Sequence, residues 1–266
     1  MRLFDIASGA TVRVERLTLR GGVANNGGGF WNGGHLTLDD VTMTAFVASS
    51  LFISNGNDLG YGACVFNVGQ LVARGSFFGF NNGQNSGGAF FGTAGASMYV
   101  TNCTFENNSS EYSGPAIGNE ATNGTARITD SLFKGNRVQY VGNFPTPAAY
   151  EGGGAILNAG TLAIAASTFQ SNTLVSAQWG GAVANHGTLS LAACTFISNR
   201  TDGVFGRGGA LFSNGTLGLT NCTFAGNGAR YGSAVDNQLG VAMRMVNCTI
   251  ARNVQNLPET FAVEVG

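Results

Sequence analysis

The chain has 266 residues and a formal net charge of −1, and charged side chains occupy only 10% of its positions. No basic stretch indicates nucleic-acid binding, and no acidic tail is present. No run approaches 18 apolar residues, so the sequence predicts no membrane-spanning helix. The length suits one elongated domain with a continuous core, which we assign to residues 1–266.

The N-terminal segment, MRLFDIASGATVRV, lacks a charged stretch followed by an apolar core, so no signal peptide is predicted. Residues 9–22 contain Val12 and Val14, then Leu17 and Leu19, which predict a partial first turn of the repeat described next. No amphipathic helix is expected to cap this end. Uncapped strand edges favour association, so self-association through this end is one expectation.

Residues from about 27 to 253 repeat one phrase, which is clearest at 180–199, GGAVANHGTLSLAACTFISN. Alignment of the copies reveals an apolar column followed three residues later by an asparagine column. The apolar column is Met43, Phe78, Phe105, Phe133, Phe169, Phe196, Phe224 and Ile250, and the asparagine column is Asn81, Asn108, Asn136, Asn172, Asn199, Asn227 and Asn253.

Each copy contains three short runs in which apolar and polar residues alternate, separated by Gly or Asn. A period of two indicates a strand. Three strands per ~27 residues, with no helical period between them, fit a solenoid whose layers stack about 4.8 Å apart. We therefore predict an all-β parallel β-helix of about eight complete rungs of three short strands, with residues 254–266 closing its C-terminal end.

Stacking of identical positions makes further predictions about the corners. The asparagine column can form an amide ladder that satisfies backbone groups at each bend. The residue before the column that contains Cys194 is expected to adopt a left-handed conformation, which Asn, Asp and Gly tolerate. These residues are Asp40, Gly75, Asn102, Asp130, Asn221 and Asn247.

Tetrads such as GGAI at 153–156, GGAV at 180–183 and GGAL at 208–211 are each followed by FxxN. This pattern resembles the polymorphic outer membrane protein repeats of bacterial surface proteins, over about residues 27–253. The resemblance implies a right-handed parallel β-helix of the pectin-lyase-like fold. It also implies a secreted or surface-attached location, because many such proteins act as adhesins or autotransporter passengers.

Aromatic residues precede the Gly-Gly step or its equivalent in several copies, where the longer insertions also fall. They are Tyr61, Tyr112, Tyr150, Trp179 and Tyr231, and an outward column adds Trp31, Phe66, Phe91 and Phe212. Flat aromatic faces along a groove suit the apolar faces of sugar rings. The alternative is that these rings cover the loops or form a contact between protomers.

Acidic residues accompany the aromatic corner, and Glu111 and Glu151 introduce neighbouring rungs. Two facing carboxylates could supply the acid and the base or nucleophile of glycoside hydrolysis. The same pair could hold Ca²⁺, as in pectate-lyase-like β-helices, although nothing else in the sequence calls for a cofactor or metal. The simpler interpretation is two solvated loop carboxylates.

Four of the five cysteines, Cys103, Cys194, Cys222 and Cys248, share one inward column with serines of other copies. We interpret them as small buried fillers, because no CxxC motif or paired histidine accompanies them. In-register stacking aims their Cβ atoms the same way, which suits a disulfide poorly.

Three hypotheses about function follow. The first is a secreted or cell-surface binding or adhesion module that contacts glycans or partner proteins through the aromatic corner. The second is a carbohydrate-active enzyme, a polysaccharide lyase, glycosidase or esterase, that uses Glu111 and Glu151 in the same groove. The third is a structural stalk segment.

Overall fold

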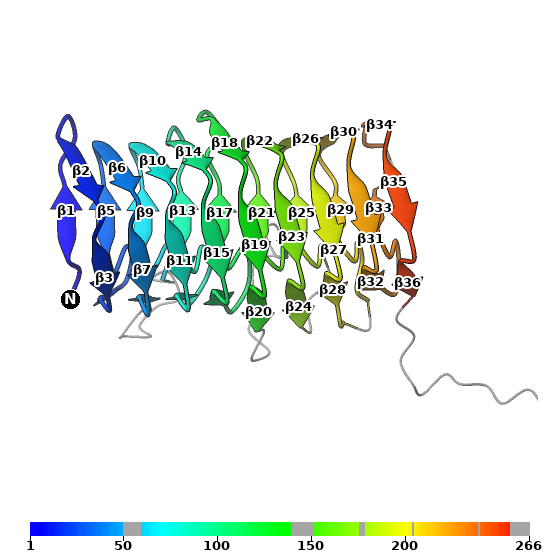
Figure 1. The fold of residues 1–266 in the computed structure, drawn as a ribbon, viewed down its shortest axis with the longest axis horizontal. Helices are drawn as coiled ribbons and strands as arrows, with labels where there is room; N and C mark the ends of the chain where they lie inside the picture. The colour runs from blue at the N-terminus through cyan, green and yellow to red at the C-terminus, as the bar shows by residue number, and fades with distance from the viewer. Residues whose placement is uncertain (50–59, 140–151, 176–178, 204, 239, 256–266) are drawn as a thin grey trace, which may run out of the picture.

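The structure is a computed structural model that describes residues 1–49, 60–139, 152–175, 179–203, 205–238 and 240–255. These residues form an elongated parallel β-solenoid, in which the chain advances one layer at a time from the N-terminus (Figure 1). Four sheets of nine strands run along it, and we name them A to D in the order in which the chain visits them. The predicted all-β solenoid is confirmed, and no helix occurs among the described residues.

Sheet A consists of three-residue strands whose first and third side chains face the interior. Its strands are β1 (Phe4–Ile6), β5 (Phe30–Asn32), β9 (Val65–Asn67), β13 (Phe90–Gly92), β17 (Ile117–Asn119), β21 (Ile156–Asn158), β25 (Val183–Asn185), β29 (Leu211–Ser213) and β33 (Val235–Asn237).

Sheet B has the longest strands, with two inward apolar residues in each. Its strands are β2 (Thr11–Glu15), β6 (His35–Asp39), β10 (Gln70–Arg74), β14 (Ser97–Thr101), β18 (Ala126–Thr129), β22 (Thr161–Ala165), β26 (Thr188–Ala192), β30 (Thr216–Thr220) and β34 (Met243–Val246).

Sheet C carries the predicted apolar column at the middle of each strand. Its strands are β3 (Thr18–Arg20), β7 (Thr42–Thr44), β11 (Phe77–Gly79), β15 (Thr104–Glu106), β19 (Leu132–Lys134), β23 (Thr168–Gln170), β27 (Thr195–Ile197), β31 (Thr223–Ala225) and β35 (Thr249–Ala251).

Sheet D follows the asparagine column and was not predicted, because most of its strands have only two residues, too few to show alternation. Its strands are β4 (Val23–Ala24), β8 (Val47–Ala48), β12 (Asn82–Gly83), β16 (Ser109–Ser110), β20 (Arg137–Gln139), β24 (Thr173–Val175), β28 (Arg200–Thr201), β32 (Gly228–Ala229) and β36 (Val254–Gln255). The first layer, β1–β4, begins upstream of the partial turn expected at residues 9–22.

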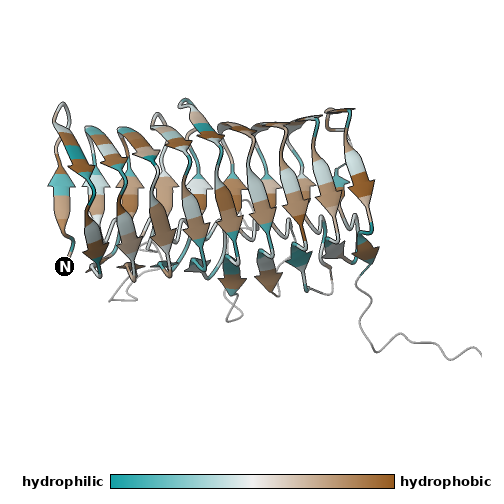
Figure 2. Cartoon of the chain, in the orientation of Figure 1, coloured by the Kyte–Doolittle hydropathy of each residue, from teal (hydrophilic) through white to brown (hydrophobic). Residues whose placement is uncertain are grey.

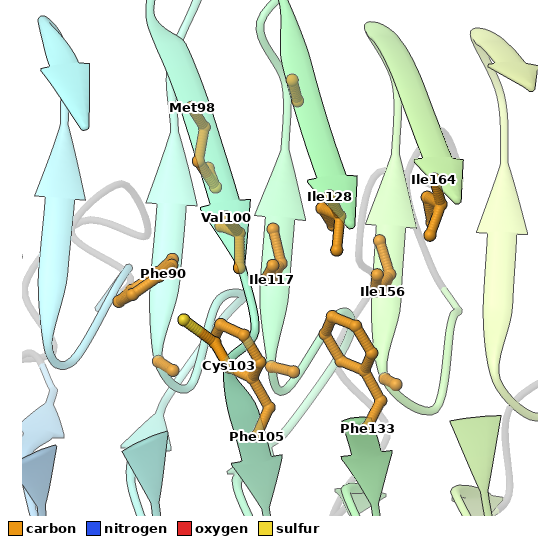
Figure 3. Close-up of a cluster of buried hydrophobic side chains, with 14 of the residues drawn as sticks. Phe90, Met98, Val100, Cys103, Phe105, Ile117, Ile128, Phe133, Ile156 and Ile164 are labelled. Atoms are coloured by element: carbon orange, nitrogen blue, oxygen red, sulfur yellow. The ribbon is translucent and has the colours of Figure 1, made fainter. Parts of the chain in front are cut away.

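Like residues lie above one another in the core, as the repeat predicts. Phe169 pairs in register with Phe196, which pairs with Phe224. The ring centroids of the first two are 4.6 Å apart and their planes differ by 3°. Figure 2 shows apolar bands recurring from layer to layer, and Figure 3 shows Phe105 and Phe133 pointing into the same interior as isoleucines of sheets A and B. The phenylalanine side chains in this column are completely buried.

The asparagine ladder forms as predicted at the corner between sheets C and D. The Asn172 Oδ1 atom accepts hydrogen bonds from the Asn136 backbone N–H at 3.0 Å and from its Nδ2 at 2.9 Å. The Asn172 Nδ2 atom in turn donates to Asn199 Oδ1 and to the Phe133 carbonyl, both at 2.9 Å. Each buried amide therefore satisfies backbone groups and continues the ladder.

The Gly-Gly step is required by close backbone approach at the corner between sheets D and A. Gly180 has a φ of 76°, and a Cβ atom there would lie 2.1 Å from the Val183 carbonyl oxygen. A Cβ atom on Gly181 would lie 2.0 Å from the Gly209 carbonyl oxygen of the next layer. Only glycine fits both positions. The predicted left-handed residues at the corner between sheets B and C, such as Asp40 and Asn102, also have positive φ.

Candidate binding surface at the corner between sheets D and A

The residue immediately before each positive-φ glycine of this corner occupies a vertical column, which we call the corner column. Isolated parallel bridges link Asn26, Tyr61, Ser86, Ser113 and Gly152 in one run, and Trp179, Arg207 and Tyr231 in a second. Three of the predicted aromatic residues, Tyr61, Trp179 and Tyr231, belong to the column. Tyr112 lies one residue before its member Ser113, and Tyr150 lies outside the described residues.

The rings of Tyr61 and Trp179 cover the outer face of sheet A. The Tyr61 ring centroid lies 4.4 Å from that of Phe91, and the Trp179 ring stacks on Phe212 at 5.3 Å. As a result, Phe91 is only 4% exposed and Phe212 only 2% exposed, although both point away from the core. These two outward rings are therefore packing partners of Tyr61 and Trp179.

Polar groups accompany Tyr61. Asn85 Nδ2 donates a hydrogen bond to the Tyr61 hydroxyl at 2.7 Å. Burial raises the pKa of the Tyr61 phenol, and the charge of Glu120 raises it further. Burial also raises the pKa of the Glu120 carboxyl. This part of the face is thus a half-buried aromatic surface with one carboxyl beside it.

Trp179 also contacts a histidine. The His186 ring lies 5.9 Å from the Trp179 ring at 71°, in an edge-on arrangement. Its Nδ1 atom is 2.8 Å from Asn214 Oδ1, in the next layer. Trp179 is only half-buried, so part of its ring is accessible to solvent beside the polar ring of His186.

The C-terminal end of the corner column is its most accessible part. Tyr231 is 42% exposed, and the guanidinium carbons of Arg207 and Arg230 each lie 5.4 Å from its ring centroid. Arg207 also forms an ion pair with Asp236 at 3.6 Å. Phe205, two residues before Arg207, is 62% exposed. Aromatic surface and positive charge thus occur together here.

The structure describes only one residue of the predicted acidic pair, Glu111. Burial raises the pKa of the Glu111 carboxyl, whereas Glu151 lies outside the described residues. Among the residues that the structure describes, no group of three or more His, Cys, Asp or Glu side chains could hold a metal ion. No helix in that part of the chain is long and apolar enough to cross a membrane.

Sequence reasoning missed Arg207, although a signal for it exists. Arg207 stands directly before Gly208-Gly209, as Trp179 stands before Gly180-Gly181. A search restricted to aromatic residues passes over it. Its contact with Tyr231 depends on bridge pairing between layers, which the spacing alone does not give.

No known protein-family model matches this chain, and no curated protein or solved structure matches it either. The resemblance to polymorphic outer membrane protein repeats therefore stays a prediction beyond the parallel β-solenoid itself.

Proposed function

We propose that this chain is a binding or adhesion module of a secreted or cell-surface protein, and that it contacts acidic glycans through Trp179, Arg207 and Tyr231. The observation that carries the proposal is the exposed Tyr231 ring with two guanidinium groups near it, continued along the column by Trp179. An aromatic face suits the C–H face of a sugar ring, and Arg binds a carboxylate or sulfate with two parallel hydrogen bonds.

The arrangement of the column supports an elongated ligand. Trp179, Arg207 and Tyr231 occupy successive layers, so the two rings are separated by about 10 Å along the solenoid axis. A glycan chain lying parallel to this axis would meet a ring, a cation and a second ring in turn. The tetrads that resemble surface-protein repeats support a location where such chains are found.

Affinity electrophoresis in gels containing an acidic polysaccharide, such as polygalacturonate, tests the proposal. Tyr231→Ala and Arg207→Gln are each expected to weaken retention at least tenfold. Phe80→Ala provides the matched control, since Phe80 is 60% exposed but lies at the corner between sheets C and D. Unretarded wild-type chain, or equal retention of all variants, would leave a structural stalk as the better account.

A carbohydrate-active enzyme is the second candidate, and one observation favours it. A general acid must stay protonated near its working pH, and burial raises the pKa of Glu111 in that direction. Polysaccharide lyase, glycosidase and ester hydrolysis activities can be assayed on the wild-type chain. Activity that falls at least 100-fold in Glu111→Gln and in Glu151→Gln, with the fold retained, would support the enzyme over the binding module.

A further inference from the structure

Three cysteines stand in consecutive layers of one inward column at the corner between sheets B and C. Cys194, Cys222 and Cys248 each lie directly before a threonine of β27, β31 or β35, and those threonines pair in register. Cys194 and Cys222 are 1% exposed, and Cys248 is partly exposed. All three thiols are free.

Serine occupies the same column in earlier layers, and it shows what each position does. The Ser131 Oγ atom donates to the Thr129 carbonyl at 2.7 Å and accepts a hydrogen bond from the Cys103 backbone N–H at 3.2 Å. The thiols follow the same pattern. The Cys222 Sγ atom donates to the Thr220 carbonyl at 3.4 Å and accepts from the Cys194 backbone N–H.

The sulfurs hold the same place in each layer. The Cys194 and Cys248 Sγ atoms donate to the Ala192 and Val246 carbonyls at 3.4 and 3.3 Å, as Cys222 does to Thr220. The sulfurs of neighbouring layers therefore lie above one another, about one layer spacing apart.

The layer spacing fits a two-coordinate soft metal ion. A zinc–sulfur bond is about 2.3 Å long, so two metal–sulfur bonds of similar length arranged in line span about 4.6 Å, and stacked layers are about 4.8 Å apart. Parallel Cβ atoms suit a disulfide poorly, yet they leave both sulfurs facing the same interior column. Soft thiolate ligands select Cu(I), zinc and iron–sulfur clusters among the biological metals. Structural zinc takes four ligands and iron–sulfur clusters take four cysteines, so a site of two thiolates favours Cu(I). We propose that Cys194 and Cys222 form a two-thiolate site for Cu(I).

The chemistry of binding balances without an oxidant or reductant. Both thiols lose their protons to solvent, two copper–sulfur bonds form, and the complex carries one negative charge. The Ser167 and Cys194 backbone N–H groups, which donate to the two sulfurs, stabilise that charge. The partly exposed Cys248 lies in the next layer and provides a nearby thiol for delivery of the ion.

The site needs only two ligands, so it is compatible with the absence of a three-ligand group among the described residues. Cys103 offers a contrast, because Ser76 and Ser131 occupy the layers on either side of it. Cys64 lies outside this column altogether, at the start of sheet A. Neither thiol can bridge to another through a single ion.

The test adds Cu(I) anaerobically to the reduced full chain, followed by a competing chelator. We expect one retained copper by native mass spectrometry, together with ultraviolet absorption from copper–thiolate charge transfer. Cys194→Ser and Cys222→Ser are each expected to lower retention at least tenfold. Both should fold, since serine already fills this column at Ser76, Ser131 and Ser167, and circular dichroism checks that they do.

Cys64→Ser and Cys103→Ser are the matched controls and should retain copper like the wild-type chain. A wild-type chain that keeps no copper would overturn the proposal, and so would full retention by Cys222→Ser. Loss of copper from Cys103→Ser would likewise contradict the assignment.

Discussion

Two ladders of buried asparagine side chains run along the solenoid axis. Replacement of a single asparagine interrupts a ladder at that layer. The second ladder lies at the end of sheet A, where Asn119 Nδ2 donates to Asn158 Oδ1 at 2.7 Å and Asn158 Nδ2 donates to Asn185 Oδ1 at 2.8 Å. The ladder is interrupted where Gly92 takes the place of asparagine. In consequence, the buried Asn119 Oδ1 atom has no hydrogen-bond partner, and such a group destabilises the fold.

Gly92→Asn is expected to stabilise the chain by about 1 kcal/mol, because the new amide can donate to Asn119 Oδ1. Gly92 does not have a positive φ, and the nearest atom to a new Cβ is the flexible Met98 Cε at 3.3 Å. Thermal and urea unfolding measure the change. Gly92→Ala is the control, since it adds a Cβ without an amide. Equal stability of the two variants would contradict the role assigned to the ladder.

Glu120 makes stability depend on pH. Its pKa is raised by burial in the folded state, so the folded chain holds the proton more tightly than the unfolded chain. The associated stability is present below the unfolded pKa of about 4.3 and is lost as pH rises through the folded pKa. Glu120→Gln should therefore be more stable than wild type at pH 7 and should lose that advantage below about pH 4.

Unfolding midpoints measured from pH 3.5 to pH 7.5 test this dependence. Glu106→Gln is a suitable comparison, because Glu106 forms a 3.1 Å ion pair with Lys134 at the surface. Its removal should change stability by less than about 1 kcal/mol and confer no gain at pH 7. A Glu120→Gln variant whose stability parallels wild type at every pH would refute the assignment.

At the scale of the element, the phenylalanine column shows how stacked strands stabilise one another. Successive ring planes from Phe105 to Phe224 differ by 2° to 7°, with centroids 4.6 to 4.9 Å apart. Each ring contacts the layers above and below it. Removal of one ring therefore weakens the contacts with two neighbouring layers. It also loses the free energy gained when the ring itself is buried.

Phe169→Ala is expected to destabilise the chain by about 3–5 kcal/mol, because it opens a cavity between Phe133 and Phe196 in a fully packed column. Phe169→Leu should cost less, since it retains most of the volume. Phe80→Ala, at a site that is 60% exposed, should change stability by no more than about 0.5 kcal/mol. Urea unfolding of the three variants gives the comparison, and similar losses for all three would exclude the stacked-column account.

The strict columns were predictable from the sequence because stacking repeats the same environment in every layer. The phenylalanine column and the first asparagine ladder both follow from that rule. The second ladder was missed because Gly92 and Ser213 interrupt it. Sheet D was missed because most of its strands have only two residues, too few to show alternation. The directions of the Tyr61 and Trp179 rings depend on contacts with the next layers, which no local pattern specifies.

At the scale of the whole molecule, each layer contacts mainly its neighbours, so the solenoid behaves as a stack. The corner column, the thiol column and both ladders run along the same axis. A ligand or ion that bridges layers therefore uses the spacing that also stabilises the core. The proposed glycan contact and the copper site both depend on this common spacing.

Pulsed electron paramagnetic resonance between spin labels on the outer face of sheet C measures this spacing. The labels replace Thr42 and Thr168 in one variant and Thr42 and Thr249 in another, with the native cysteines changed to serine. The pairs are separated by four and seven layer steps, which predicts distances of about 19 Å and 34 Å, broadened by the label arms. Distances that rise in the ratio of the layer steps would confirm the stack, whereas distances unrelated to the number of layers would contradict it.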